Sequence, residues 1–462
     1  MKLSERIWVA LCLSAVAVPL WSQANTPPTQ PAPAYGTGIV ENSDSRMMPP
    51  PTVSGQSYPE VGTSQERHNY LRAGVAFAAA YSDNVAESTG STVQSVNDES
   101  YSVFPTLGLD EATARLRLTM SYAPGFTFYQ HTSSLNHTDQ NASIDLQYRL
   151  SPHVTFSALD ELHESSSVFN FSPVGAAGSV SGAIQEPNQS VIAPYASELN
   201  NFGNSGITYQ FAANEMVGAS GNFNNLHYLD SKQAPGLLDS ASRGGAAFYA
   251  YRISKVHYIG VTYQYQRLLS YPALGTNVTQ THAILLLYTL NAGSKFSASV
   301  FGGPQYADIG TQYVNGVSLP APASQSWHPQ AGASLNWRGH LHSAAISYAH
   351  MISGGGGLVG AAKMESVSAH LSQQLKRTLS GAVWAAYAQN NEAASALAGI
   401  DNGHTWVGNA SLQKQFSEHL NVELGYTRLQ YSYTRVSVLS SVPATNRESI
   451  SISYQFSHPL GR

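Results

Sequence analysis

The sequence contains one cysteine, Cys12, among 462 residues. The rest of the chain therefore has no disulfide, no thiol nucleophile and no cysteine metal ligand. Charged residues form 11% of the chain, well below the ~25% typical of soluble domains. The formal net charge is −5, without the clustered Lys and Arg that nucleic acid binding requires. Apolar runs approaching ~18 residues are also missing after the first segment, so no membrane-spanning helix is expected.

Residues 1–24 are predicted to be a secretory signal peptide. Lys2 and Arg6 form its basic end, Ile7–Leu20 its apolar core and Ser22–Ala24 a small-residue cleavage site. The alternatives are a transmembrane anchor and a lipoprotein cleaved at Cys12, but both need longer apolar runs than this segment offers. We therefore expect export across the inner membrane.

Residues 25–68 are rich in Pro, Ser, Thr, Gln and Gly, as in "NTPPTQPAPAYGTG". Such a segment buries too little apolar area to offset its ordering entropy, so we expect a disordered periplasmic tail. A docking arm for a periplasmic partner or for peptidoglycan is the alternative interpretation.

Long runs of alternating apolar and polar residues begin near Asn69. Within "RLRLTMSYAPGFTFYQ", every second residue from Leu116 to Phe128 is apolar or proline. Successive side chains of a strand point to opposite faces, so the segment predicts a strand with one apolar and one polar face. The same pattern recurs in residues 71–81, 143–149, 259–266, 331–337 and 449–456.

Short turns and long loops separate these runs in alternation. We expect a short turn at Asp110–Ala112, for example, and long loops at Ser82–Glu99 and Ser166–Glu198. A soluble β-sandwich also alternates, but its strands recur every ~8–12 residues, whereas here the spacing is about 22. Short turns on one side and long loops on the other are typical of an outer-membrane barrel. The pattern predicts an all-β transmembrane antiparallel barrel of about 18 strands (16–18) over residues 69–458.

A family resemblance supports the barrel. "AGVAFAAAYSDNV" (Ala73–Val85) and "YSVFPTLGLDEATARLRLTMSYAPGFTFYQH" (Tyr101–His131) resemble the start of the outer-membrane β-barrel porins often found near exopolysaccharide genes. The closing "ESISISYQFS" (Glu448–Ser457) is similar to the last strand by which such proteins are recognised for insertion, although "SHPLGR" follows it. The resemblance implies insertion by the barrel-assembly machinery, and it carries no catalytic residue over to this chain.

Three motifs allow a chemical interpretation and a structural one. "GGGLVG" (Gly355–Gly360) matches a dinucleotide fingerprint but precedes a strand-like run, so we interpret it as an outer loop. "DELHE" (Asp160–Glu164) would place Glu161 and His163 on one face, either as lumen polarity or as an acid–base or metal site. His340 and His342 could chelate a metal, but they lie near a predicted turn.

The polar faces of the strands should enclose the lumen. The charged residues expected to line it are Arg72, Arg115, Arg117, Asp145, Arg149, Arg252 and Glu423. We predict an outer-membrane channel for passive diffusion of hydrophilic solutes or for export of a polysaccharide, without a cofactor, with Ser166–Glu198 as the plug or constriction. A structural or surface-display barrel with an occluded lumen is the second hypothesis, and a barrel hydrolase that depends on His163 is the third.

Overall fold

The computed structural model describes residues 37–38, 47, 61–62, 69–89, 92–165, 167, 169, 197–230, 237–293, 295–313, 321–354, 361–393, 403–433 and 444–460. All of them belong to one compact unit, Pro33–Arg462. The predicted signal peptide and most of the predicted tail lie outside these residues. In residues 25–68, the two-residue strands β1 (Thr37–Gly38) and β2 (Val61–Gly62) pair in parallel.

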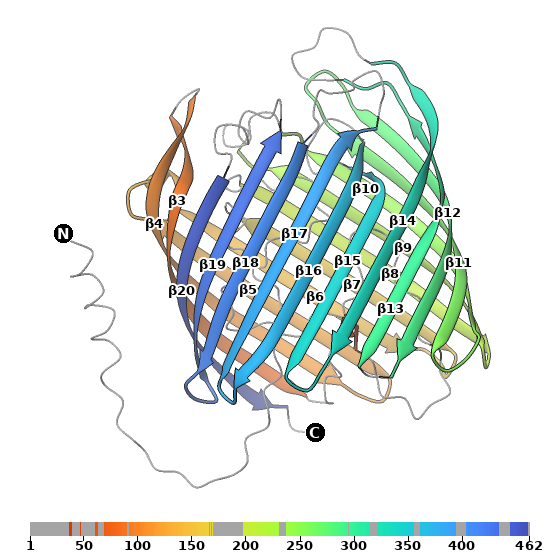
Figure 1. Cartoon of the computed structure of the whole chain (residues 1–462), viewed down its shortest axis with the longest axis horizontal. Helices are drawn as coiled ribbons and strands as arrows, with labels where there is room; N and C mark the ends of the chain where they lie inside the picture. Colours follow the sequence, from red (N-terminus) through yellow and green to blue (C-terminus); the bar gives the residue numbers. More distant parts are fainter. Residues whose placement is uncertain are drawn as a thin grey trace. The chain divides into compact units, whose positions relative to one another are not determined.

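Eighteen antiparallel strands, β3–β20, follow one another around a closed barrel, and β20 pairs with β3 to complete it (Figure 1). The predicted all-β barrel and its strand number are thereby confirmed. The strands are β3 (Tyr70–Thr89), β4 (Thr92–Ala112), β5 (Leu116–Tyr129), β6 (His137–Arg149), β7 (Val154–Ser165), β8 (Glu198–Ala212), β9 (Glu215–Tyr228), β10 (Ser240–Arg252), β11 (His257–Ser270), β12 (Asn277–Ala292), β13 (Phe296–Ile309), β14 (Ser324–Arg338), β15 (His342–Ser353), β16 (Ala362–Lys376), β17 (Leu379–Glu392), β18 (Gly403–Gln415), β19 (Leu420–Tyr433) and β20 (Ala444–Pro459).

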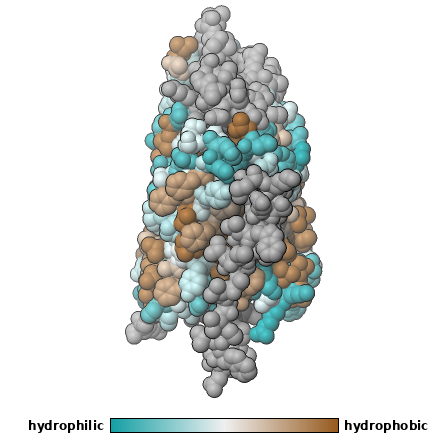
Figure 2. Space-filling view, turned by 90° about the vertical axis from the view of Figure 1, so that its left-hand side faces the viewer, coloured by the Kyte–Doolittle hydropathy of each residue, from teal (hydrophilic) through white to brown (hydrophobic). Residues whose placement is uncertain are grey.

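The residue alternation in the sequence becomes an outward and an inward face. On β12, Ile284 and Leu286 point outward and are 58% and 69% exposed, whereas Leu285 between them points inward and is fully buried. The outward face carries the large apolar side chains on nearly every strand, including Met120, Tyr122, Phe126 and Phe128 of β5. Figure 2 shows hydrophobic residues gathered over the middle of one side of the barrel with hydrophilic residues above them. None of the described segments is a helix with the length and apolarity that a membrane crossing requires.

The two ends of the barrel differ in their connections. At one end, called the turn end here, short segments join the strands, such as Ala213–Asn214 and Gly293–Lys295. Gly293 adopts a φ of 67°, a left-handed conformation that suits glycine. At the other end, the loop end, connections are longer, such as the one between β7 and β8.

Two predicted connections were wrong in position. The first short turn lies at Thr113–Arg115 rather than Asp110–Ala112, because β4 continues to Ala112. The predicted loop Ser82–Glu99 is mostly strand: β3 and β4 stay paired as far as Thr89 and Thr92, beyond a register shift after Ser82. The two strands form a hairpin that rises past their neighbours at the loop end (Figure 1). Its alternation is masked in the sequence by polar residues on both faces.

Candidate functional site

The inward face has a charged wall and a neutral wall. Charged side chains lie on β3–β8 and on β19–β20, where the strands close the barrel. They are Arg72, Asp98, Asp110, Arg117, Asp139, Asp145, Arg149, Glu161, Glu198, Glu423 and Arg447. On the described inward positions of β9–β18, the charged residues are Arg252, Arg338 and Lys376, each the last residue of its strand at the turn end. Serine, threonine, asparagine and glutamine supply most of the polarity of this neutral wall.

The charged wall is neutralised only in part, because the acids in this list outnumber the arginines. Arg72 forms an ion pair with Asp110 on the neighbouring strand at 2.5 Å. Arg117 of β5 interacts electrostatically with Asp145 of β6. Glu423 is 5% exposed and faces inward on β19. Opposite charges on adjacent strands lower the net field that a solute would meet.

Three of the predicted lumen residues lie at the turn end: Arg115 falls outside the strands, whereas Arg149 and Arg252 occupy the last inward positions of β6 and β10. Arg115 lies in the turn Thr113–Arg115 and is exposed, because β5 begins one residue later. The guanidinium of Arg149 donates to the carbonyl of Ala114 at 3.4 Å. Arg252 donates to the carbonyl of Ala213 at 2.6 Å, and so both arginines bind turn backbone at the turn end.

The loop-end half of the lumen wall is buried. Inward residues there, such as Asn141, Met364 and Leu429, are 0% exposed. Inward residues nearer the turn end, such as Ser121 and Ser368, are half-buried. An empty lumen would leave both halves accessible to water. The loop-end half is therefore the more closely packed, whereas burial is mixed in the turn-end half, where Met216 and Ala250 are also buried.

One segment that fills the lumen begins at the end of β7. The Ser165 hydroxyl donates to Asp139 on β6 and bonds the backbone of Ser167, whose amide lies 3.2 Å from the Ser165 Oγ. Both serines are 1% exposed. The chain leaving β7 is thus held against the inner wall instead of projecting from the rim.

The same segment then reaches towards β20. The Phe169 ring is 4% exposed, and the Arg447 guanidinium carbon lies 5.0 Å from its centre. Four strands, β3–β6, separate β7 from β20 in the barrel order, so this contact spans part of the lumen. The predicted inward position of the Ser166–Glu198 loop is observed at Ser167 and Phe169; most of its other residues lie outside the described part of the chain.

A second inward contact comes from the end of β15. A side chain at Gly354 would meet Leu268 of β11 at 3.8 Å, although three strands lie between β11 and β15. Leu268 packs with Ile309, Ala361 and Ala393 in one buried cluster. Residues of the connections between strands, such as Ala361 and Ala393, therefore cover apolar inward residues near the loop end.

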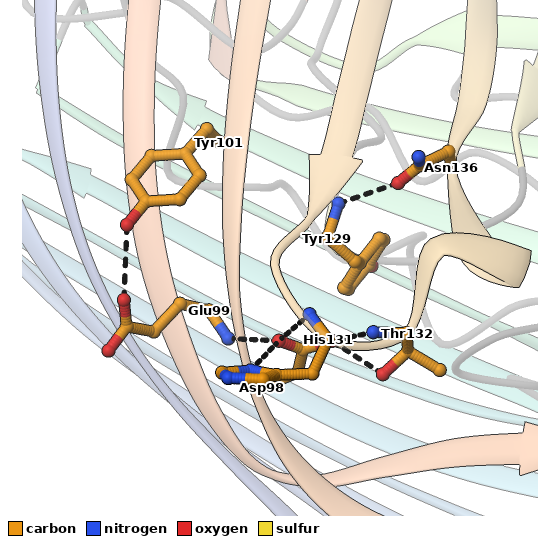
Figure 3. Close-up of polar contacts among 7 residues, drawn as sticks. All are labelled: Asp98, Glu99, Tyr101, Tyr129, His131, Thr132 and Asn136. Atoms are coloured by element: carbon orange, nitrogen blue, oxygen red, sulfur yellow. Dashed lines mark hydrogen bonds and ion pairs between the residues drawn. The ribbon is translucent and has the colours of Figure 1, made fainter.

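Asp98 holds the connection after β5 (Figure 3). Its carboxylate is 2% exposed and accepts hydrogen bonds from the amides of Glu99, His131 and Thr132 at 2.7, 3.0 and 2.7 Å. The Thr132 hydroxyl also donates to it. Asp98 lies beyond Ser100, which pairs with the last residue of β5, and so it is outside the membrane-crossing part of the strand.

The pKa of Asp98 has two opposing causes. Burial raises the pKa of this carboxyl, but the hydrogen bonds from Thr132 and His131 together outweigh burial and bring the pKa below its usual 3.8. The carboxylate therefore stabilises the folded connection above the unfolded pKa of about 4, and this stabilisation is lost as pH falls through the folded pKa.

Asp98→Asn is expected to lower the free energy of opening of the β5–β6 connection by about 1–3 kcal/mol, because an amide NH₂ replaces one acceptor. Hydrogen-exchange protection of the His131 and Thr132 amides measures this. In the wild type, protection should fall between pH 6 and pH 2.5; in the variant it should be low at both values. Asp308→Asn, at an exposed carboxylate, is the control. Equal protection of the wild type at both pH values would contradict the role of Asp98.

A methionine from the predicted tail lies inside the turn-end half. Met47 is 7% exposed and packs against Met216 and Ala250, inward residues of β9 and β10. Its amide donates to the Gln210 side chain at 3.1 Å. The composition of residues 25–68 gave no sign of this contact, since a single apolar residue in a polar segment carries no periodicity.

The motifs that suggested chemistry are explained by wall contacts. Glu161 and His163 both face inward, and His163 Nδ1 lies 2.9 Å from the Asn141 oxygen. Ser326 and His328 form a Ser–His pair at 2.7 Å, but within the described residues no acid or amide contacts the other ring nitrogen. His342 begins β15, and His340 lies in the preceding turn. No metal-binding group of three or more His, Cys, Asp or Glu exists in the described part of the chain, and Gly355–Gly360 falls outside it.

Comparison with known proteins gives structural likeness only. No family model matches the chain and no curated protein matches it, so the family resemblance stays a prediction. Pseudomonas aeruginosa OccK2 (OpdF) is similar with a TM-score of 0.41 and 10% identity, over 84% of this chain and 98% of that one. P. aeruginosa OpdQ gives a TM-score of 0.40 and 12% identity, over 85% and 99%. The ferric citrate transporter FecA gives 0.39 and 10%, over 81% and 61%.

Proposed function

We propose that the protein is an outer-membrane channel that lets small uncharged hydrophilic solutes diffuse across. The observation that carries this proposal is the neutral wall, which spans ten of the barrel's strands, β9–β18. Barrels of 16–18 strands are wide enough for an aqueous lumen. A wall of hydroxyl and amide groups exchanges hydrogen bonds with a permeating solute as water does, without a charge that would hold it.

The outward face supports a membrane location. Large apolar side chains project from nearly every strand, and a soluble protein rarely exposes contiguous apolar area on this scale. Closure of the sheet pairs the backbone groups that hydrocarbon cannot solvate. With a periplasmic turn end, the proposed sidedness follows the usual arrangement of short turns and long outer loops. We also propose that the β20 strand is the signal read by the assembly machinery.

The chemistry of the neutral wall favours solutes with several hydroxyl groups, such as saccharides. Inward hydroxyls are already paired across strands, as in Ser299–Ser334 at 2.7 Å and Ser347–Ser368 at 2.6 Å. Paired hydroxyls keep spare acceptor capacity for a passing sugar. Export of a long polysaccharide would extend this proposal. The greatest length of saccharide that passes through the barrel decides between diffusion of small solutes and export.

Planar-bilayer recording and liposome swelling test the channel. We expect a steady conductance with a preference for K⁺ over Cl⁻, because the acids of the charged wall outnumber its arginines, and swelling rates that fall as the saccharide lengthens. Ser368→Trp, which adds bulk to the inward face of β16, should lower both rates. Ala369→Trp, at the adjacent outward position, should leave them unchanged.

A second function is favoured by one observation, the burial of the loop-end half of the lumen. A structural or surface-display barrel would need no open path. Absence of conductance and of swelling, with the protein shown to be folded by heat-modifiable electrophoretic mobility, would replace the channel proposal by this one. Lipid hydrolysis by the purified protein, lost in Ser326→Ala or His163→Ala, would instead favour an enzyme.

A further inference from the structure

Two arginines face each other on the outward surface of the barrel. Arg243 of β10 and Arg267 of β11 are direct register partners, and both are exposed. Side chains directly opposite each other on antiparallel strands stand about 5 Å apart at their Cβ atoms, and like charges in this position destabilise the sheet. A pair of this kind is stable when an anion lies between the two guanidinium groups.

The described part of the chain does not supply that anion. In the part of the chain that the structure describes, neither Arg243 nor Arg267 has an ion pair or hydrogen bond. The acids at neighbouring outward positions are engaged elsewhere. Asp239 contacts His227 at 2.5 Å and accepts from the Tyr228 amide, and Asp308 accepts from Gln325 at 3.3 Å.

The position of the pair matches the outer boundary of a membrane. Ser240 and Ser270 end the two strands at the loop end, and the arginines lie three residues below them. The next outward positions towards the turn end hold Tyr265 and Tyr263, and Tyr263 is 47% exposed. Tyrosines gather where hydrocarbon meets head groups, so the guanidinium groups above them lie at head-group level.

A strip of small residues on β9 and β10 extends from Arg243 towards the turn end. Gly221 and Gly245 are register partners directly below the row that contains Arg243. A side chain at Gly221 would have only a backbone oxygen within 4 Å, at 3.8 Å, and one at Gly245 only a backbone oxygen at 3.4 Å. Ala219 and Ala247 continue the strip, and Phe223 flanks it. This surface can receive an extended acyl chain below a head group.

We infer that Arg243 and Arg267 bind the phosphate of a phosphorylated glycolipid of the outer leaflet, whose acyl chain lies along the Gly221–Gly245 strip. The inference rests on the outer-membrane location proposed above. Guanidinium groups bind phosphate through bidentate charge-assisted hydrogen bonds, and two of them on adjacent strands can hold one phosphate from both sides. No group transfer is involved.

Binding of lipid A to the purified barrel in neutral detergent tests the inference. Arg243→Gln with Arg267→Gln should weaken lipid A binding about thirtyfold, since each basic side chain near an anionic head group contributes about a factor of five. Arg115→Gln with Arg377→Gln, two exposed arginines in turns at the opposite end, should bind as the wild type does. The lysine pair Arg243→Lys with Arg267→Lys should lose only a small part of the affinity.

Two further arms identify the ligand. Dephosphorylated lipid A should bind the wild type and the glutamine pair equally weakly, and inorganic phosphate should fail to compete with lipid A. Wild-type affinity in the glutamine pair, with folding verified by electrophoretic mobility, would overturn the inference, as would full competition by inorganic phosphate. Conductance of the same variants should be unchanged, so that loss of lipid binding and failure of the channel are read separately.

Discussion

Leu286→Arg lowers the free energy of unfolding of the bilayer-inserted barrel by about 2–4 kcal/mol, the range for arginine at the lipid-facing midplane of such barrels. Leu286 is 69% exposed on the outward face of β12, with Val261 and Gly302 as its register partners. With most of its side chain uncovered, an arginine there must enter hydrocarbon or draw water into it.

Thr289→Arg is the matched control. Thr289 lies three residues further along the same strand, faces inward and is half-buried. A charge there faces the lumen instead of hydrocarbon and should destabilise the barrel by less than about 1 kcal/mol. Urea unfolding in phospholipid vesicles, followed by tryptophan fluorescence, measures both variants. An equal effect of the two arginines would show that the outward face does not contact hydrocarbon.

Removal of residues 168–196, with Ser167 joined to Ser197, raises single-channel conductance roughly twofold or more, because it takes Phe169, buried beside Arg447, out of the lumen. The observations behind this expectation are the anchoring of Ser167 by Ser165 and the Phe169–Arg447 contact. Arg447 would lose its aromatic neighbour and face the lumen, so anion permeability should rise with the conductance.

Shortening the β3–β4 hairpin at the register pair Val85–Val96 gives the control for that deletion. It removes a similar kind of loop-end material from above the rim and should leave conductance unchanged. Wild-type conductance after the 168–196 deletion would mean that other residues set the constriction, with the Gly354 contact on Leu268 as the next place to change.

The strands could be predicted from the sequence because the apolar outward face and the polar inward face of each strand alternate residue by residue. Outward positions such as Leu116 and Phe128 are apolar and inward positions such as Arg117 and Thr127 are polar, so period and fold class follow together. The tip of the β3–β4 hairpin lacks this alternation. Polar residues occupy both alternating positions of this segment, so the sequence shows no apolar period there.

The contacts inside the lumen could not be predicted in the same way. Phe169 and Arg447 are separated by most of the chain, and only closure of the barrel brings them together. The sequence placed Asp98 in a loop. Its contact with His131 and Thr132 depends on the pairing of β4 with β5, which the alternation does not reveal. On β12 and β13, Leu285, Leu287 and Phe301 face inward although they are apolar, and they pack with Ala283 in one buried cluster.

The pairing of β20 with β3 has a consequence for biogenesis. Tyr70 meets Pro459 across this seam, so the first and last strands of the barrel must find each other after the intervening chain has been made. Until then the growing sheet keeps two unpaired edges that can template association with other chains. Contacts between partners so distant in sequence form slowly, since loop closure precedes any gain from them. A catalyst that holds one edge while the other arrives would shorten this vulnerable interval.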